Sequence, residues 1–329
     1  MIYLFKIFNE LNQLNSKDNK KNLTFKINDS NDAWLIADLL VAKELFRKYE
    51  CNVRIAPMVN FQQDIKQVNL DQISNFFQYS PYLKNNLDHS EMRRVFSNFY
   101  SKLESSPKIR WDKNAQVSFL KSFDNKKSIF QSCRLYVLNY LLFMLDDYFG
   151  YKFSSINVNE NFSLFDFYAT KKQLSNLQNF ISQLNEYLEF QNNLLLNNNK
   201  WNIISLFVMG YEALSVSIFF AIKEDILHYE KNDIFKKSSA ISLLGTRIVT
   251  KNFKINDIKF KKNDEIFISP YLINQTSVQN HSFGMGSHSC LGKKLSLLIV
   301  DNFKNVYADK INSTLKIRNL RNFILRYEN

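Results

Sequence analysis

Glycine and proline are scarce, since the 329 residues contain six glycines and four prolines. β-Sandwiches and barrels need turn residues at short intervals, so this scarcity argues against both and favours a mostly helical protein. Cysteine is scarce as well, with Cys51, Cys133 and Cys290 far apart in the chain. Three widely spaced cysteines make neither a disulfide framework nor a zinc pattern, which favours a reducing cytoplasm.

Long hydrophobic runs are also lacking. The N-terminal stretch Met1–Leu14 carries polar residues such as Lys6 and Glu10, so it is neither a signal peptide nor long enough to span a bilayer. The apolar stretch Phe207–Ile222 is interrupted by Glu212 and is too short for a span. We therefore expect a soluble, cytoplasmic protein.

Apolar and aromatic residues, by contrast, are abundant. Hydrophobic residues make up 45% of the chain and aromatic residues 15%, with 30 phenylalanines, which is ample material for a large core. A chain of this length forms either one large domain or two.

Three of the six glycines fall within residues 283–292, which read FGMGSHSCLG. Gly284 and Gly286 can adopt a positive φ and let the backbone approach a flat partner closely. Cys290 precedes an apolar run, Leu291–Val300, that predicts a helix. A sulfur near a helix N-terminus is favoured as a thiolate. The stretch therefore suits a cysteine that ligates the metal of a large flat cofactor such as haem.

The same stretch resembles the cysteine-ligand loop of the cytochrome P450 superfamily, whose pattern is Phe-x-x-Gly-x-His/Arg-x-Cys-x-Gly. Every fixed position is filled, by Phe283, Gly286, His288, Cys290 and Gly292. Two other interpretations stay open. One is a buried structural cysteine beside a glycine turn, and the other is a hydrolytic pair of Cys290 and His288, for which no orienting acid is identifiable.

The resemblance implies a mainly α fold with a small β-sheet, in a shortened and divergent member of the superfamily that forms a single domain over residues 1–329. It implies haem b, iron protoporphyrin IX, as the cofactor, with Cys290 as the iron ligand and the other four fixed residues of the loop around the haem. Bacterial members of the superfamily lack a membrane anchor, so a soluble chain fits a bacterial member.

A second match lies upstream of the cysteine loop. His89 and Arg93 are four residues apart, so they share one face of a helix that Asp88 can cap. Alone, two such basic residues favour a solvated helix face, but the resemblance implies that they hold the haem propionates. Arginine suits this role because its planar fork pairs carboxylates at two points. The resemblance gives Arg247 and His288 the same role.

Residues 207–214 resemble the helix that crosses the distal face of the haem, where the family has Ala/Gly-Gly-x-Asp/Glu-Thr-Thr. Gly210 and Glu212 match this pattern. A mid-helix glycine costs about 1 kcal/mol relative to alanine, and room for oxygen or substrate is a reason to keep it. Ala213 stands where the family has the threonine that passes protons to dioxygen. The resemblance makes these three residues the catalytic region, with Glu212 handling protons; an acid paired within the core is the alternative for Glu212.

Two further elements of the family pattern are not found. Asp233-Ile234-Phe235-Lys236 is at most a degenerate form of the Glu-x-x-Arg pair that supports the proximal side. Only eight residues, none of them arginine, separate Asn274 from Phe283, so the segment that carries a further arginine is missing. We expect the support of the cysteine loop to come from elsewhere.

Other segments predict regular structure without a chemical role. Apolar residues at helical spacing predict helices at Trp34–Tyr49, Ser128–Phe149 with Gly150 as C-cap, Leu164–Asn199, Trp201–Glu224 and from Cys290 to about Asp309. Asn-Asp turns predict strands between residues 255 and 268, and residues 314–328 predict a terminal hairpin. By resemblance, the third of these helices would form a shortened roof over the substrate.

The formal net charge of +12 suggests an acidic partner. The basic residues are spread out without a stacking motif or a basic tail, which argues against a nucleic-acid interface. Lys293 and Lys294 follow the cysteine loop and Arg94 adjoins the propionate helix, so an acidic ferredoxin or flavodoxin would be steered to this face. Solvated lysines are the alternative.

Together these patterns predict an oxidoreductase that oxidises a small or peptide-like organic substrate. It would act as a monooxygenase, or through an atypical oxidation or coupling that does not need the missing threonine. The altered distal and proximal patterns motivate an alternative, a degenerate and non-catalytic cytochrome P450-like paralogue that serves as a binding or assembly partner, with or without haem.

Overall fold

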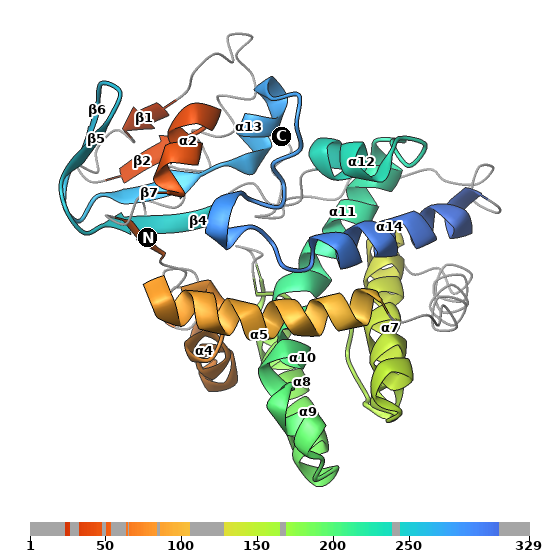
Figure 1. The fold of residues 1–329 in the computed structure, drawn as a ribbon. Coiled ribbons are helices and arrows are strands. Elements are labelled where there is room, and N and C mark those ends of the chain that lie inside the picture. Colours follow the sequence, from red (N-terminus) through yellow and green to blue (C-terminus); the bar gives the residue numbers. More distant parts are fainter. Residues whose placement is uncertain are drawn as a thin grey trace.

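The computed structural model describes residues 24–26, 33–47, 51–53, 64, 66–83, 86–105, 128–164, 169–238 and 244–308. The described chain is mostly helical, with a small sheet to one side of the helices (Figure 1). The predicted fold class, mainly α with a small sheet, is confirmed. The N-terminal stretch Met1–Leu14 and the hairpin expected at 314–328 lie outside the described residues.

A five-stranded sheet has the strand order β1-β2-β7-β4-β3. Strands β2 and β7 are parallel and the other pairs are antiparallel. A separate hairpin joins β5 and β6, with Asn256 at a positive φ in its turn. The expected strands between residues 255 and 268 are therefore confirmed, and Arg247 lies inside strand β4. The strand bounds are β1 Thr24–Lys26, β2 Ala33–Ile36, β3 Cys51–Val53, β4 Leu244–Val249, β5 Phe253–Ile255, β6 Ile258–Phe260 and β7 Glu265–Ile268.

The helix predicted over Trp34–Tyr49 is wrong in its first part. Residues 33–36 form strand β2, which pairs with β7 more than 200 residues later in the chain. Helix α2 then spans Leu39–Leu45, because the Asp38 side chain caps it by accepting from the N–H groups of Leu40 and Val41. The apolar residues 34–36 therefore serve the sheet, a long-range pairing that helical spacing cannot reveal.

The other helices agree with the sequence more closely. Helix α7 begins with a Ser128 capping box and ends at Gly150, whose φ is 74°. Helix α8 begins after the Thr170 cap instead of at Leu164, and Asp88 lies in the first turn of α5 instead of capping it. The bounds are α4 Asp71–Gln78, η1 Pro81–Leu83, α5 Asn86–Glu104, α7 Ile129–Phe149, η2 Phe153–Ser155, α8 Lys171–Phe190, α9 Leu194–Asn198, α12 Lys231–Ser238, α13 Pro270–Thr276, η4 Gly286–His288 and α14 Lys293–Ala308.

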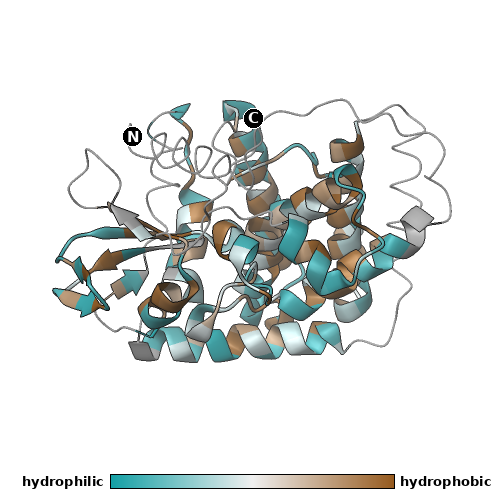
Figure 2. Cartoon of the chain, turned by 90° about the horizontal axis from the view of Figure 1, so that it is seen from above, coloured by the Kyte–Doolittle hydropathy of each residue, from teal (hydrophilic) through white to brown (hydrophobic). Residues whose placement is uncertain are grey.

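One continuous helical segment, which we call the central helix, runs through the helical part. It comprises α10 (Lys200–Ser205), the π-helical turn η3 (Leu206–Tyr211) and α11 (Glu212–Lys223). It packs against α7, α12 and α14, and the main apolar core surrounds it. A second, smaller core lies between the sheet and α2. Figure 2 shows hydrophobic residues where helices face one another and hydrophilic residues on outer faces.

Within the described ranges, the central helix is the one helix that is long and apolar enough to cross a membrane. It is longer than the apolar stretch that the sequence suggested. Most of its apolar window is buried inside the protein, and this core position accounts for its hydropathy.

Candidate functional site

The loop that precedes α14 is folded by its own backbone. The Cys290 N–H donates to the carbonyl of Phe283 at 2.7 Å, and the Ser289 N–H donates to Gly286 at 3.1 Å. Gly284 and Gly286 both have a φ of 68°, as predicted. A Cβ on Gly286 would also lie 3.4 Å from the Cβ of Phe46. The loop therefore presents Cys290 three residues before helix α14 begins.

A buried polar network that the sequence did not reveal anchors this loop. The Asn274 side chain donates to the Ser282 hydroxyl at 2.8 Å and accepts from the His281 N–H at 2.7 Å. Ser282 in turn donates to the carbonyl of Phe235 on α12 at 2.8 Å. The rings of Phe235 and Phe283 lie 4.8 Å apart. Hydrogen bonds from neutral side chains thus connect the loop to α12 and α13.

Basic side chains from three parts of the chain meet beside the loop. The rings of His89 on α5 and His288 in the loop lie 4.0 Å apart. Arg93, one turn along α5, donates to the Ser289 carbonyl at 2.7 Å. Arg247 of strand β4 is 3% exposed, and its guanidinium carbon lies 5.1 Å from the centre of the Phe46 ring. We call His89, Arg93, Arg247 and His288 the basic cluster.

No side chain of the basic cluster forms an ion pair with an acid among the described residues. Burial lowers the pKa of His288 to about 3, and the charges of Arg247, His89 and Arg93 contribute. Burial also lowers the pKa of Arg247 to about 10. The pKa of His89 falls for the same reasons, burial first and then Arg93 and Arg247. Among the described residues, no acid neutralises the positive charge of Arg93 and Arg247, so the cluster is suited to an anionic ligand.

The Cys290 side chain is exposed, while Cys51 and Cys133 are buried, and none of the three forms a disulfide with a described residue. Solvent can reach the Cys290 side chain, yet protein atoms around it at longer range reduce its hydration. This burial raises the pKa of the Cys290 thiol, and the Gly292 N–H, Arg93 and Lys293 oppose the shift. Desolvation therefore opposes the thiolate that the start of the helix is expected to favour.

Tyr100 of α5 connects the loop to the central helix. Its ring lies 3.3 Å from the position of a Cβ on Gly292, and its hydroxyl shares a hydrogen bond of 2.9 Å with the Ser205 hydroxyl. The same Cβ position lies 4.0 Å from the Cys290 sulfur. Gly292 is therefore a position of close approach, where any larger residue would press on Tyr100.

The central helix changes its pitch at the residues singled out in the sequence. The π-helical turn Leu206–Tyr211 contains Gly210, and π-helical turns are frequent at functional sites. A Cβ on Gly210 would meet nothing within 4 Å, so open space lies beside it. Ala213 follows in the first turn of α11 and is half-buried. The spacing of the apolar residues could not reveal this change in pitch.

Glu212 is buried and its carboxylate is held by groups away from the cysteine loop. It accepts hydrogen bonds from the Ser163 hydroxyl and, at 3.1 Å, from the Leu164 N–H. Arg134 of α7 lies 3.8 Å from one carboxylate oxygen, and both side chains are almost fully buried. These contacts are those expected of an acid paired within the core, which was the alternative interpretation of Glu212.

Solved structures of cytochromes P450 match this arrangement over most of the chain. The thermophilic cytochrome P450 from Sulfolobus tokodaii matches with a TM-score of 0.60 at 15% identity, covering 91% of both chains. Epothilone D-bound P450epoK matches with a TM-score of 0.64 at 11% identity, covering 93% of this chain and 91% of the other. P450BioI, in complex with an acyl carrier protein ligated to hexadec-9Z-enoic acid, matches with a TM-score of 0.59 at 13% identity, covering 94% of this chain and 93% of the other. The chain has the cytochrome P450 fold. No protein-family model and no curated protein matches it by sequence.

The structure shows the surroundings of two places where the sequence departs from the cytochrome P450 pattern. Helix α12, which contains the degenerate Asp233–Lys236 stretch, holds the cysteine loop through Phe235 and Ser282. On the central helix, the Ser215 hydroxyl near Ala213 donates to the Tyr211 carbonyl at 2.7 Å and so serves its own helix. The loop is thus supported without the Glu-x-x-Arg pair.

Proposed function

We propose that the chain binds haem through Cys290 and oxidises a small or peptide-like organic substrate. The observation that carries the proposal is the basic cluster beside the cysteine loop, which has no acidic partner among the described residues. Two haem propionates would supply that negative charge. Buried arginine and histidine donors at this place, next to an accessible thiol, fit a flat cofactor with a metal at its centre and carboxylates at its edge.

Bound haem supplies the iron that activates oxygen or peroxide towards a substrate. The chain would hold it with Cys290 on the iron and the basic cluster on the propionates. Arg93 acts on both, because its contact with the Ser289 carbonyl fixes the residue next to the ligand. Phe283, Gly286 and Gly292 shape the loop around the cofactor. The specific form, haem b, is part of the proposal.

We assign the distal side to the central helix. Gly210 keeps side-chain volume out of the space beside the π-helical turn. Ala213 offers no hydroxyl, so proton delivery would use a water or a substrate hydroxyl. Glu212, held by Arg134 and Ser163, fixes the helix and sets the charge near that path. Chemistry with a low demand for protons, such as peroxide use or radical coupling, suits this set of residues.

Exposed basic residues lie next to the cysteine loop: Arg94 on α5, and Lys293 and Lys294 at the start of α14. We assign the face formed by these three residues to an acidic electron donor such as a ferredoxin or flavodoxin. P450BioI binds an acyl carrier protein, and a carrier protein is the second class of partner to test on this face. We further propose that residues 1–329 form a single haem-binding domain in the cytoplasm.

One observation favours a second function. The Glu212 carboxylate is fully engaged by structural partners and Ala213 lacks a hydroxyl, which suits a non-catalytic relative that binds haem or a protein partner. Consumption of a reductant or of peroxide in the presence of candidate substrates separates the two, because only the enzyme turns over.

The haem content of the purified protein tests the proposal. The wild type, Cys51→Ala and Cys133→Ala should all be red and carry one haem per chain, whereas Cys290→Ala should lose the thiolate spectrum. The two control cysteines are buried in the protein. A colourless wild type that is stably folded and does not take up added haemin would refute the proposal.

A further inference from the structure

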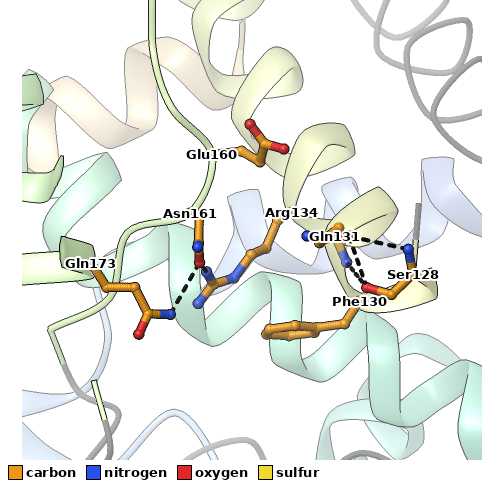
Figure 3. Close-up of a pocket in the computed structure, with 7 residues that line it drawn as sticks. All are labelled: Ser128, Phe130, Gln131, Arg134, Glu160, Asn161 and Gln173. Carbon is orange, nitrogen blue, oxygen red and sulfur yellow. Dashed lines mark hydrogen bonds between the residues drawn. The ribbon is translucent and has the colours of Figure 1, made fainter. Parts of the chain in front are cut away.

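The positive charge of Arg134, outside the basic cluster, is compensated inside the protein. Arg134 lies beside a cavity of about 420 Å³ at the start of α7, where it donates to the Asn161 side chain at 3.1 Å (Figure 3). Its guanidinium also lies 3.8 Å from the Glu212 carboxylate. The β5–β6 hairpin, in contrast, carries positive charge that faces solvent.

Residues 251–262, which form the hairpin and its base, contain five lysines, and all five are exposed. We call them the hairpin lysines: Lys251, Lys254, Lys259, Lys261 and Lys262. Asp257, in the turn, is the acid of this stretch. In Figure 1 the hairpin lies at the outer edge of the sheet, away from α14. The hairpin lysines therefore form a basic face separate from that of Arg94, Lys293 and Lys294.

The strand register brings these lysines close to one another. Lys254 lies directly opposite Lys259 across the hairpin. At the base, the Asn252 side chain accepts from the Lys262 N–H at 2.7 Å, which places Lys251 and Lys262 at the same end. Like charges directly opposite each other on neighbouring strands are destabilising. The hairpin thus carries a repulsion that an anionic partner would relieve.

The protein itself neutralises little of this charge. Lys254 pairs with Asp257 at 3.3 Å, and none of the other four hairpin lysines forms an ion pair with an acid among the described residues. Asp264, the next acid along the chain, is buried and accepts from the Trp34 ring N–H and from the Lys261 backbone N–H. Three residues of a strand span about 10 Å, which is about one Debye length, so the hairpin lysines attract an anion together.

The inner face of the hairpin is apolar and holds it against the sheet. Phe253 stacks on Phe260 with the ring centres 5.0 Å apart, and the Trp34 ring of β2 lies 5.1 Å from that of Phe260. Ile255, opposite Ile258, is buried. The lysines are therefore presented on a scaffold that is already ordered, which lowers the cost of binding.

The exposed residues of the hairpin indicate the kind of partner. They are lysines, asparagines and one aspartate, so this face offers no apolar side chain for a membrane and no ring for stacking on nucleic-acid bases. A uniformly anionic surface would repel the fully exposed Asp257, whereas a protein can place a basic residue against it. We propose that the hairpin lysines form a docking surface for an acidic protein. The proposal does not depend on haem binding.

Titration of a fluorescent decaglutamate peptide with the full-length protein at low salt, followed by anisotropy, tests the proposal. The peptide presents the carboxylates of an acidic protein surface. We expect wild-type protein to bind it and the double variant Lys259→Gln/Lys262→Gln to bind it about tenfold more weakly. Lys171→Gln/Lys172→Gln is the matched control, because it removes two exposed lysines from α8 and lowers the net charge equally. It should change the affinity less than about twofold.

Three results would overturn the proposal. The first is no binding of the peptide to folded wild-type protein, and the second is an equal loss of affinity in the two double variants. The third is a hairpin variant that loses more affinity for a short DNA duplex, or for vesicles with phosphatidylglycerol, than for the peptide. Circular dichroism of each variant shows whether its fold is intact. Since none of these measurements uses haem, their outcome is separate from that of the proposed haem function.

Discussion

Replacing Arg247 by methionine should stabilise the haem-free protein while weakening haem binding. Arg247 is a buried cation without an ion-pair partner among the described residues, and burial lowers its pKa from 12.5 to about 10. Methionine preserves most of the apolar packing over Phe46 and removes the charge. A buried charge replaced by an apolar side chain of similar volume is often neutral or stabilising.

The size of the effect follows from the pKa. Each pKa unit corresponds to about 1.4 kcal/mol, so the shift of Arg247 corresponds to about 3 kcal/mol of unfavourable charge burial at neutral pH. The folded pKa lies below the unfolded one, so the penalty is fully present below pH 10 and is relieved as the pH rises above it. Lost packing and local relaxation reduce the gain, and we expect a stabilisation of about 1–3 kcal/mol.

Urea unfolding of the haem-free protein at neutral pH measures this change, and haemin titration measures the loss of affinity. Arg94→Met is the matched control, because Arg94 is an exposed arginine on α5 outside the basic cluster. It should change stability by less than about 0.5 kcal/mol and leave haem affinity unchanged. If Arg247→Met destabilised the haem-free protein or bound haem as tightly as wild type, the idea of a basic cluster that awaits an anion would be refuted.

Two other perturbations test the basic cluster and the loop anchor. The pKa of His288 is about 3 in the fold and 6.5 ordinarily, so the unfolded chain takes up the proton first and stability should fall from pH 6.5 downward. One proton can change stability by at most about 1.4 kcal/mol per pH unit, and the partial exposure of the ring makes the change smaller. His288→Gln should flatten this slope in urea unfolding at several pH values, and an unchanged slope would contradict the assignment. Asn274→Ala removes the bond to Ser282 and leaves the His281 N–H unpaired, which should cost about 3 kcal/mol. Gln279→Ala, at an exposed side chain nearby, should cost less than about 0.5 kcal/mol. Equal losses in the two variants would refute the anchor.

The cysteine loop could be predicted because its signal is local. Glycine enrichment at Gly284 and Gly286 points to positive φ wherever the loop sits, and both have it. The caps of α7 at Ser128 and Gly150 are local in the same sense. Such features depend on residues a few positions apart, so the chain around them decides the conformation.

Other features depend on partners far along the chain. Residues 34–36 look helical by spacing but form a strand because β7 lies beside them. The surroundings of Glu212 come from Ser163, Leu164 and Arg134, about 50 to 80 residues earlier. Spacing could not reveal these contacts.

The pKa of Cys290 is a further property that could not be predicted from the sequence alone. The sequence correctly places its sulfur near the start of a helix, which favours a thiolate. The opposing desolvation depends on how much protein surrounds the thiol, and burial raises its pKa. Likewise, the role of Asn274 as the loop anchor depends on α12 lying against the loop. The sequence thus predicted the backbone conformation of the cysteine loop but not its electrostatics or its support.

The absorption spectrum of the reduced carbon-monoxide complex tests the central claim most directly, because the Soret band of haem shifts to the red when a thiolate is the ligand. Wild-type protein with bound haem should show the shifted band, and Cys290→Ala should show an unshifted band or no haem at all. A wild-type spectrum without the shift, or a shifted band that persists in Cys290→Ala, would contradict Cys290 as the ligand to iron.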